Sequence, residues 1–174
     1  MILVLSTSLN PDSNSRLLAH ETARFLGAEG VETEFLDLRE HPLPFCDGGA
    51  AYAQPEVKTA SELIARADAI VVATPIYNYT INAALKNLVE LTGGAWENKV
   101  VAFLCAAGGN SSYMSIMGLA NSLMLDFRCL VVPRFVYATG RDFSDGRIAS
   151  TEVRQRVADL ARATHRLTKL PSAA

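Results

Sequence analysis

Five short apolar segments alternate with amphipathic segments along this chain, and the alternation limits the folds open to it. Segments such as ILVL and IVVA are continuous apolar runs, which is typical of strands buried on both faces. Strands that alternate with helices predict a parallel sheet covered by helices on both faces. The predicted strands are residues 2–5, 31–38, 69–73, 99–106 and 129–138, the last interrupted by Pro133, and the predicted helices are residues 13–29, 55–66, 83–91, 113–126 and 150–169.

Right-handed crossovers leave few arrangements, and we expect a doubly wound, five-stranded parallel sheet in the order 2-1-3-4-5. The chain of 174 residues suits one domain with a substantial core, so residues 1–174 are predicted to form a single domain. In such sheets ligands bind beyond the carboxyl ends of the strands, where the strand order reverses. Polar loops follow the first, third and fourth strands, which are adjacent in this order, so we expect the loops to form one site.

The first loop, residues 6–16, reads STSLNPDSNSR and leads into a predicted helix. The first N–H groups of a helix lack internal partners and carry partial positive charge, which suits a phosphate. Ser and Asn are also the preferred capping residues, so an ordinary helix start is the alternative. Capping needs one such residue, and the loop offers five: Ser8, Asn10, Ser13, Asn14 and Ser15. We therefore favour phosphate binding.

The second loop, residues 74–82, reads TPIYNYTIN. It presents Pro75, Ile76, Tyr77, Asn78 and Tyr79. Two aromatic rings with nearby backbone amides suit the plane and edge of a heteroaromatic ring. A turn whose tyrosines cover the core is an equally good alternative for this loop alone.

The third loop, residues 106–112, reads AAGGNSS and contains Gly108 and Gly109. Glycine lets the backbone approach a ligand closely, although a plain turn after a strand is again the alternative. A phosphate site, a site for a flat ring and a glycine turn together suit a mononucleotide that carries a ring system.

Composition excludes several function classes. The net charge of −2 argues against a nucleic-acid binder and against a polybasic membrane anchor, and no apolar run is long enough to span a bilayer. Cys46, Cys105 and Cys129 have no metal-type spacing, so we predict no metal site and a reducing, cytoplasmic setting. No G-x-G-x-x-G and no Walker lysine is present, and no catalytic acid, base or nucleophile stands out. That pattern favours a cofactor that carries its own chemistry.

Three segments resemble the NAD(P)H-dependent FMN reductases of the flavodoxin-like fold: LSTSLNPDSNSR, DLREHPLPFCDGG and TPIYNYTINAALKNLVEL. They are similar to the family's phosphate loop of Gly-Ser-x-Arg with further serines, to its Asp-Leu with a Leu-Pro-rich turn, and to its Pro-x-Tyr-Asn loop with a Leu-Lys-Asn helix. The resemblance runs from Met1 to about Ala138. Thr7 stands where the family usually has Gly, and Asn10 where it often has Arg, so a cationic phosphate partner is lost there.

The resemblance implies a flavodoxin-like α/β fold, FMN as cofactor, and NADPH or NADH as co-substrate. It also implies a small-molecule electron acceptor such as a free flavin, quinone, azo compound or metal oxyanion, and a homodimer or homotetramer. By the resemblance, Ser8, Ser13, Asn14 and Ser15 hold the phosphate, Pro75, Tyr77, Asn78 and Tyr79 border the isoalloxazine, and Gly108 and Gly109 approach its pyrimidine edge.

Two alternatives remain beside the reductase: a flavodoxin-type electron carrier and a flavin-binding regulatory module. A carrier usually needs a strongly charged docking face, which a net charge of −2 does not favour. The regulatory module stays open because a fold does not fix a function. Residues 83–91 and 113–125 carry more apolar surface than one sheet face needs, which favours a homo-oligomer, and the arginines of residues 150–169 are interpreted as a solvated helix face.

Overall fold

A parallel sheet organises residues 1–169, the part of the chain that the computed structural model describes. Its strands and the short strands around it are β1 (Ile2–Ser6), β2 (Thr33–Asp37), β3 (Ala69–Tyr77), β4 (Thr80–Ile81), β5 (Val100–Ala107), β6 (Leu130–Val131), β7 (Val136–Thr139), β8 (Phe143–Ser144) and β9 (Arg147–Ile148). The α-helices are α1 (Asn14–Ala28), α2 (Pro55–Arg66), α3 (Ala83–Thr92), α4 (Met117–Phe127) and α5 (Thr151–Leu167). Short 3-10 helices are η1 (Ala50–Ala53), η2 (Gly93–Trp96), η3 (Asn110–Ile116) and η4 (Gly140–Asp142).

The strand order confirms the predicted fold. Strands β2, β1, β3 and β5 pair side by side in parallel, and β6 and β7 both pair in parallel with the far edge of β5. The interrupted fifth strand of the prediction is therefore β6 followed by β7, and the order 2-1-3-4-5 holds for the principal strands. Strand β2 lies at the other edge of the sheet.

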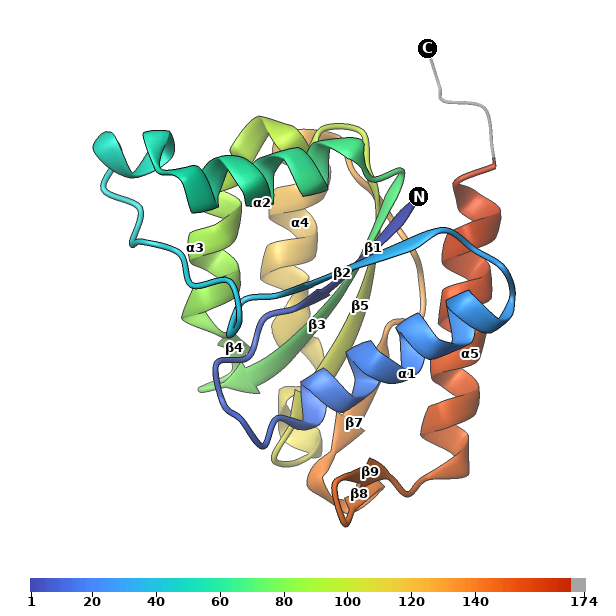
Figure 1. Cartoon of the computed structure of the whole chain (residues 1–174). Helices are drawn as coiled ribbons and strands as arrows, with labels where there is room; N and C mark the ends of the chain where they lie inside the picture. The colour runs from blue at the N-terminus through green and yellow to red at the C-terminus, as the bar shows by residue number, and fades with distance from the viewer. Residues whose placement is uncertain (170–174) are drawn as a thin grey trace.

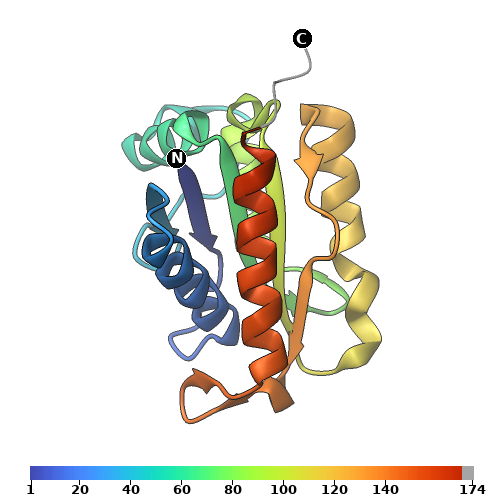
Figure 2. The same cartoon turned by 90° about the vertical axis from the view of Figure 1, so that its right-hand side faces the viewer.

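Two apolar layers hold the helices to the sheet. Leu3 and Leu5 of β1 belong to the core under α2, α3 and α4, whereas Ile2 and Val4 belong to the core under α1 and α5. This division follows from the alternation of side chains along a strand. Helices α1 and α5 accordingly cover one face of the sheet, and α2, α3 and α4 cover the other (Figures 1 and 2).

The structure differs from the prediction where tertiary contacts outweigh local signals. Strand β3 continues to Tyr77, because its pairing with β5 runs through Thr74 and Pro75, so the second loop is shorter than the predicted 74–82. Residues 80–81 then return as β4. Residues 110–116 form the 3-10 helix η3 before α4 begins at Met117, and the hairpin of β8 and β9 was not predicted.

The helices within residues 1–169 are all too short or too polar to cross a membrane.

Candidate functional site

A cavity of about 690 Å³ lies at the carboxyl edge of the sheet, where segments following β1, β3, β5 and β7 meet. Most of the predicted site residues line it: Asn10, Ser13, Asn14, Ser15, Pro75, Ile76, Tyr77, Asn78 and Gly108. It is also lined by four residues that the sequence analysis missed: Asp12, Ala106, Ala107 and Gly140. The last three follow from topology alone, since Ala106 and Ala107 end β5 and Gly140 directly follows β7 at the same edge.

The first loop ends in a capped helix. Ser13 is the N-cap of α1, and its hydroxyl accepts a hydrogen bond from the Arg16 amide at 3.3 Å. The same hydroxyl lies 2.9 Å from the Ser15 hydroxyl, so the two oxygens face one another at the helix start. The first turn contains no acidic residue. The capping role and the cavity-lining role of Ser13 therefore coexist, and the helix start presents N–H and hydroxyl donors to the cavity.

Ser8 does not line the cavity. Its side chain is buried, and its hydroxyl accepts from the Asn10 amide at 3.3 Å, while the Asn10 side-chain oxygen accepts from the Asp12 amide at 3.0 Å. These short-range bonds shape the loop itself. Ser8 is thus a loop-forming residue in this structure and not part of the cavity wall.

Arg16 bonds to the backbone of the first loop and to Asp37. Its guanidinium contacts Asp37 at the end of β2, with Nε donating to Oδ2 at 2.6 Å. The other two nitrogens donate to the backbone carbonyls of Ser8 at 2.7 Å, Asn10 at 2.6 Å and Pro11 at 3.2 Å. Both charged side chains of this pair are only 11% exposed. Neither Arg16 nor Asp37 was predicted to have a role, and the only local signal for Asp37 was its place in the DLREHPLP segment.

Asn82 joins the first loop to the second. Its side-chain oxygen accepts from the hydroxyls of Thr7 at 3.0 Å and Thr74 at 3.1 Å, and its amide donates to the Thr7 carbonyl at 2.7 Å. The Thr7 hydroxyl is also 3.1 Å from the Ala73 carbonyl. All three polar side chains are buried. Thr7, which replaces the glycine usual in the resembling family, is therefore part of a hydrogen-bonded network that fixes both loops.

The second loop is a tight turn between β3 and β4. Asn78 and Tyr79 have φ angles of 49° and 65°, in the left-handed region that asparagine tolerates better than most residues. Tyr77 is 50% exposed and lines the cavity, whereas Tyr79 is 58% exposed and does not. The two tyrosine side chains are therefore not packed over the core, which argues against the alternative that this loop is only a turn whose tyrosines cover the core.

In the third loop, Gly108 lines the cavity and Gly109 does not. The Gly109 carbonyl instead accepts a 2.6 Å hydrogen bond from the Tyr137 hydroxyl. Burial raises the pKa of this phenol, which keeps it protonated as a donor. A Cβ added at either glycine meets no protein atom within 4 Å, and neither residue has a positive φ. The protein's own packing therefore does not require glycine here.

The charge around the cavity is sparse. Among the lining residues within 1–169, Asp12 is the only acid, and there is no lysine or arginine. A phosphate in this cavity would be held by backbone amides, hydroxyls and side-chain amides at the start of α1, with the helix dipole as the source of positive charge.

Comparisons with known proteins agree with this geometry. The family model for NADPH-dependent FMN reductases matches residues 1–143. The chain is 35% identical to an NAD(P)H-dependent FAD/FMN reductase of Geobacillus thermodenitrificans, over 75% of this chain and 72% of the relative. It is 28% identical to an NADPH azoreductase of Bacillus sp. strain OY1-2, over 70% of this chain and 69% of the relative. The fold resembles FerB, a flavoenzyme NAD(P)H:acceptor oxidoreductase from Paracoccus denitrificans, with a TM-score of 0.78 at 19% identity, covering 97% of this chain and 96% of that one.

Proposed function

The chain belongs to the NADPH-dependent FMN reductase family, and on that premise we propose that the cavity at the carboxyl edge of the sheet is its FMN site. The protein is an NAD(P)H-dependent FMN reductase. It takes reducing equivalents from the nicotinamide and passes two electrons to a small acceptor, which we place among free flavins, quinones, azo compounds and metal oxyanions. The observation that supports this assignment most strongly is that the three predicted loops converge on one cavity of about 690 Å³.

The donor set at the start of α1 fits the phosphate of FMN. Ser13, Asn14 and Ser15 line the cavity at the first helical turn, where backbone amides lack partners within the helix. We assign the phosphate to these residues and to Asn10, with Ser8 shaping the loop beneath them. The loss of the family's arginine at position 10 leaves this site without a cationic side chain, which favours weaker retention of FMN.

The opposite wall fits the ring of FMN. Pro75, Ile76, Tyr77 and Asn78 line it, and the exposed Tyr79 directly follows them in the chain. The backbone at Gly108 is accessible from the cavity, because no protein atom occupies the space that a Cβ would fill. Gly109 supports this backbone through its bond from Tyr137. When bound, FMN supplies the hydride and electron chemistry itself, so the chain needs no catalytic acid, base or nucleophile. Its residues bind the phosphate, orient the ring and leave one side open to co-substrate and acceptor.

The sparse charge favours the reductase over an electron carrier. Carboxylates crowded around a flavin would oppose negative charge on the reduced ring, and among the lining residues only Asp12 is acidic, at the phosphate end. Backbone N–H groups near Gly108 favour negative charge on the pyrimidine edge instead.

We also propose that the protein is a cytoplasmic homo-oligomer of one domain, residues 1–174. Exposed apolar side chains gather on η3 and α4: Tyr113, Met114, Met117, Met124 and Leu125. The sequence indicated surplus apolar surface on α3 as well, but its large apolar side chains are buried within the chain: Leu85, Leu88, Val89 and Leu91. The free thiols of Cys46, Cys105 and Cys129 suit a reducing compartment.

Flavin binding and nucleotide oxidation test the function separately. Titration with FMN, FAD and riboflavin should show tightest binding of FMN, because only the phosphate terminus matches the start of α1. Anaerobic NADPH or NADH should bleach the bound flavin, and added FMN should sustain nucleotide oxidation in air. Equal affinity for riboflavin and FMN would contradict the phosphate site, and a flavin that neither nucleotide bleaches would contradict the reductase.

A further inference from the structure

Tyr137 brings a polar group into an otherwise apolar strand. It lies on β7 between Val136 and Ala138, and it is the partner of Cys105 in the register of β7 with β5. Its side chain is only 7% exposed and belongs to the apolar core under α2, α3 and α4. A phenylalanine ring would fill the same space, so packing accounts for the ring of Tyr137 and not for its hydroxyl.

The Tyr137 hydroxyl reaches the third loop of the proposed FMN site. It donates a hydrogen bond of 2.6 Å to the carbonyl of Gly109, which directly follows the cavity-lining Gly108. A peptide unit is planar and trans, so a bond that holds the Gly109 carbonyl also sets the direction of the next N–H, that of Asn110. One side-chain hydroxyl therefore fixes the orientation of a whole peptide plane beside the cavity.

The third loop has little else to hold it. Gly108 and Gly109 are both exposed, and glycine has the greatest backbone freedom of all residues. Within residues 1–169, no other side chain is hydrogen-bonded to the backbone of residues 108–111. The Tyr137 hydroxyl is thus the side-chain anchor of the most flexible part of this loop.

The anchor itself is fixed in both its backbone and its ring. The backbone of Tyr137 is held by the parallel pairing of β7 with β5. Its ring packs edge-on against Tyr113 at 5.3 Å, and Tyr113 in turn packs on Phe135 at 4.8 Å. A donor held in this way orients its partner without adapting to it, so the loop takes its position from the strand.

We propose that Tyr137 is a positioning residue for the flavin ring. Its hydroxyl holds the Gly109 carbonyl and thereby keeps the backbone of Gly108 in place at the cavity, where the pyrimidine edge of FMN is expected. This inference rests on the proposed function, because it assigns a role toward the FMN of that site. Backbone N–H groups near Gly108 favour negative charge on this edge, and reduction of FMN increases that charge. The anchor should therefore matter more for reduced FMN than for oxidised FMN.

The role of Tyr137 differs from that of a residue at the phosphate end. Arg16 holds the first loop, which we assign to the phosphate, whereas Tyr137 holds the third loop, which we assign to the ring. FMN and riboflavin share the ring and differ in the phosphate. Loss of the Tyr137 hydroxyl should therefore weaken both flavins by the same factor.

The variant Tyr137→Phe tests the proposal, because it removes the hydroxyl and keeps the ring in the core. We expect the affinities for oxidised FMN and riboflavin to fall together, and the affinity for reduced FMN to fall about fivefold more, the size of one hydrogen bond. That difference lowers the two-electron midpoint potential of bound FMN by about 20 mV. Fluorescence titration of the two flavins, and anaerobic dithionite titration beside a reference dye, measure these quantities without a nicotinamide nucleotide.

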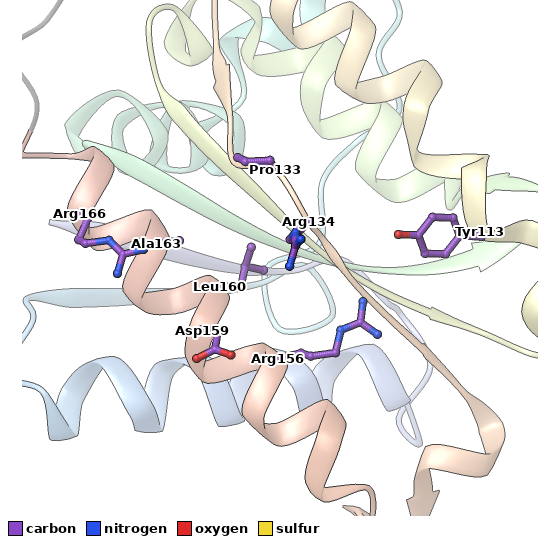
Figure 3. Close-up of a pocket in the computed structure, with 8 residues that line it drawn as sticks. All are labelled: Tyr113, Pro133, Arg134, Arg156, Asp159, Leu160, Ala163 and Arg166. Atoms are coloured by element: carbon purple, nitrogen blue, oxygen red, sulfur yellow. The ribbon is translucent and has the colours of Figure 1, made fainter.

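Tyr113→Phe is the matched control, since it removes a hydroxyl from the neighbouring ring of the same aromatic cluster. Tyr113 lies in the wall of a second cavity, of about 580 Å³, along α5 (Figure 3). Its hydroxyl forms none of the side-chain hydrogen bonds described for residues 1–169. The control should leave both flavin affinities and the potential as they are in the wild type.

The outcomes separate the role of Tyr137 from the proposed function. If wild type and Tyr137→Phe bind FMN with the same potential, or if the ratio of FMN to riboflavin affinity falls in the variant, the role is wrong and the function stands. If the variant shows the lower potential but neither NADPH nor NADH bleaches the wild-type flavin, the reductase is rejected and the role is retained. A wild type that binds no flavin would reject both.

Discussion

Arg16 directs its charge into the protein and not toward a ligand. Each of its nitrogens donates to Asp37 or to a carbonyl of the first loop, so no donor is left for a phosphate. The guanidinium fixes the carbonyls of Ser8, Asn10 and Pro11, in a loop that has no regular secondary structure of its own. We infer that Arg16 is a positioning residue: it aligns the loop that meets the FMN phosphate without touching the phosphate itself.

Arg16→Gln should therefore reduce binding of FMN more than binding of riboflavin. Loosening the phosphate loop removes contacts that only FMN makes, so the ratio of FMN to riboflavin affinity should fall at least about tenfold, as expected for losing about 1.4 kcal/mol or more. Fluorescence titration of both flavins measures this ratio. Arg24→Gln is the control, since Arg24 lies on the same helix and is exposed in its pair with Glu21. An equal loss of both affinities would show that Arg16 acts only on stability, and Asp37→Asn should reproduce the selective loss.

The cysteines should differ sharply in reactivity. Burial raises the pKa of the Cys105 thiol to about 12, so it stays protonated in the fold, whereas Cys46 is partly exposed. At pH 8 an aromatic disulfide reagent should label Cys46 rapidly and Cys105 only after denaturation, and Cys46→Ser should remove the fast phase.

Because the thiol pKa is higher in the fold than in the unfolded chain, Cys105 contributes stability below about pH 8.5 that is lost as the pH rises toward 12. Rapid labelling of folded Cys105 would contradict its burial.

At the level of elements, Asn82 connects three segments that are far apart in sequence. It precedes α3 and bonds to Thr7 after β1 and to Thr74 within β3. An alanine at this position leaves two buried hydroxyls and a buried carbonyl with fewer partners. The loops of the proposed FMN site are thus held together by one amide side chain.

Asn82→Ala should lower the free energy of unfolding by about 2 kcal/mol, the usual penalty for leaving buried polar groups unsatisfied. Urea denaturation followed by circular dichroism measures this change. Ser122→Ala is the control, because Ser122 is exposed on α4 and has no hydrogen-bonded side chain among the described contacts. A loss no larger than that of the control would mean that water or rearrangement replaces the network.

The element pattern was predictable wherever local signals agreed with tertiary pairing. Helix α2 matches residues 55–66 as predicted, since Pro55 starts it and its apolar stripe is clear. The predicted end of β3 was wrong, because Thr74 and Pro75 look like loop residues. Pairing with β5 extends the strand to Pro75, and pairing with β4 extends it to Tyr77. The split into β6 and β7 followed from Pro133, but the left-handed Arg134 beside it had no sequence signal.

The candidate site was predictable to the same degree. Strand order alone brings the three loops together, so most lining residues were found from their place after a strand. The pair of Arg16 and Asp37 joins residues 21 positions apart, and no local pattern reports such a contact. The second cavity combines α5 with the break between β6 and β7 (Figure 3), and it likewise appears only in three dimensions.

At the scale of the whole molecule, exposed apolar side chains gather on η3 and α4. Met117, Met124 and Leu125 are 43%, 40% and 76% exposed, and Met114 on η3 is 55% exposed. Spaced seven and eight residues apart, the three α4 side chains lie on one helix face, opposite the buried Leu119 and Leu123. Adaptable methionines gathered on one surface are typical of protein contacts. We infer that this face of α4 meets its own copy across a two-fold axis.

The double variant Met117→Glu with Leu125→Glu, which adds charges of one sign only, should therefore convert the proposed oligomer to monomer. In a two-fold interface each substitution occurs twice, and each charge buried without a partner costs several kcal/mol, so dissociation should be favoured at least about a hundredfold. Sedimentation velocity at micromolar concentration measures the change against wild type. Glu62→Lys is the control, because Glu62 is exposed on α2 and its substitution leaves α4 unchanged. If the wild type sediments as a monomer, or the double variant remains associated, the α4 face is not the subunit contact. If the variant becomes monomeric and still binds FMN, the flavin site is complete within one chain.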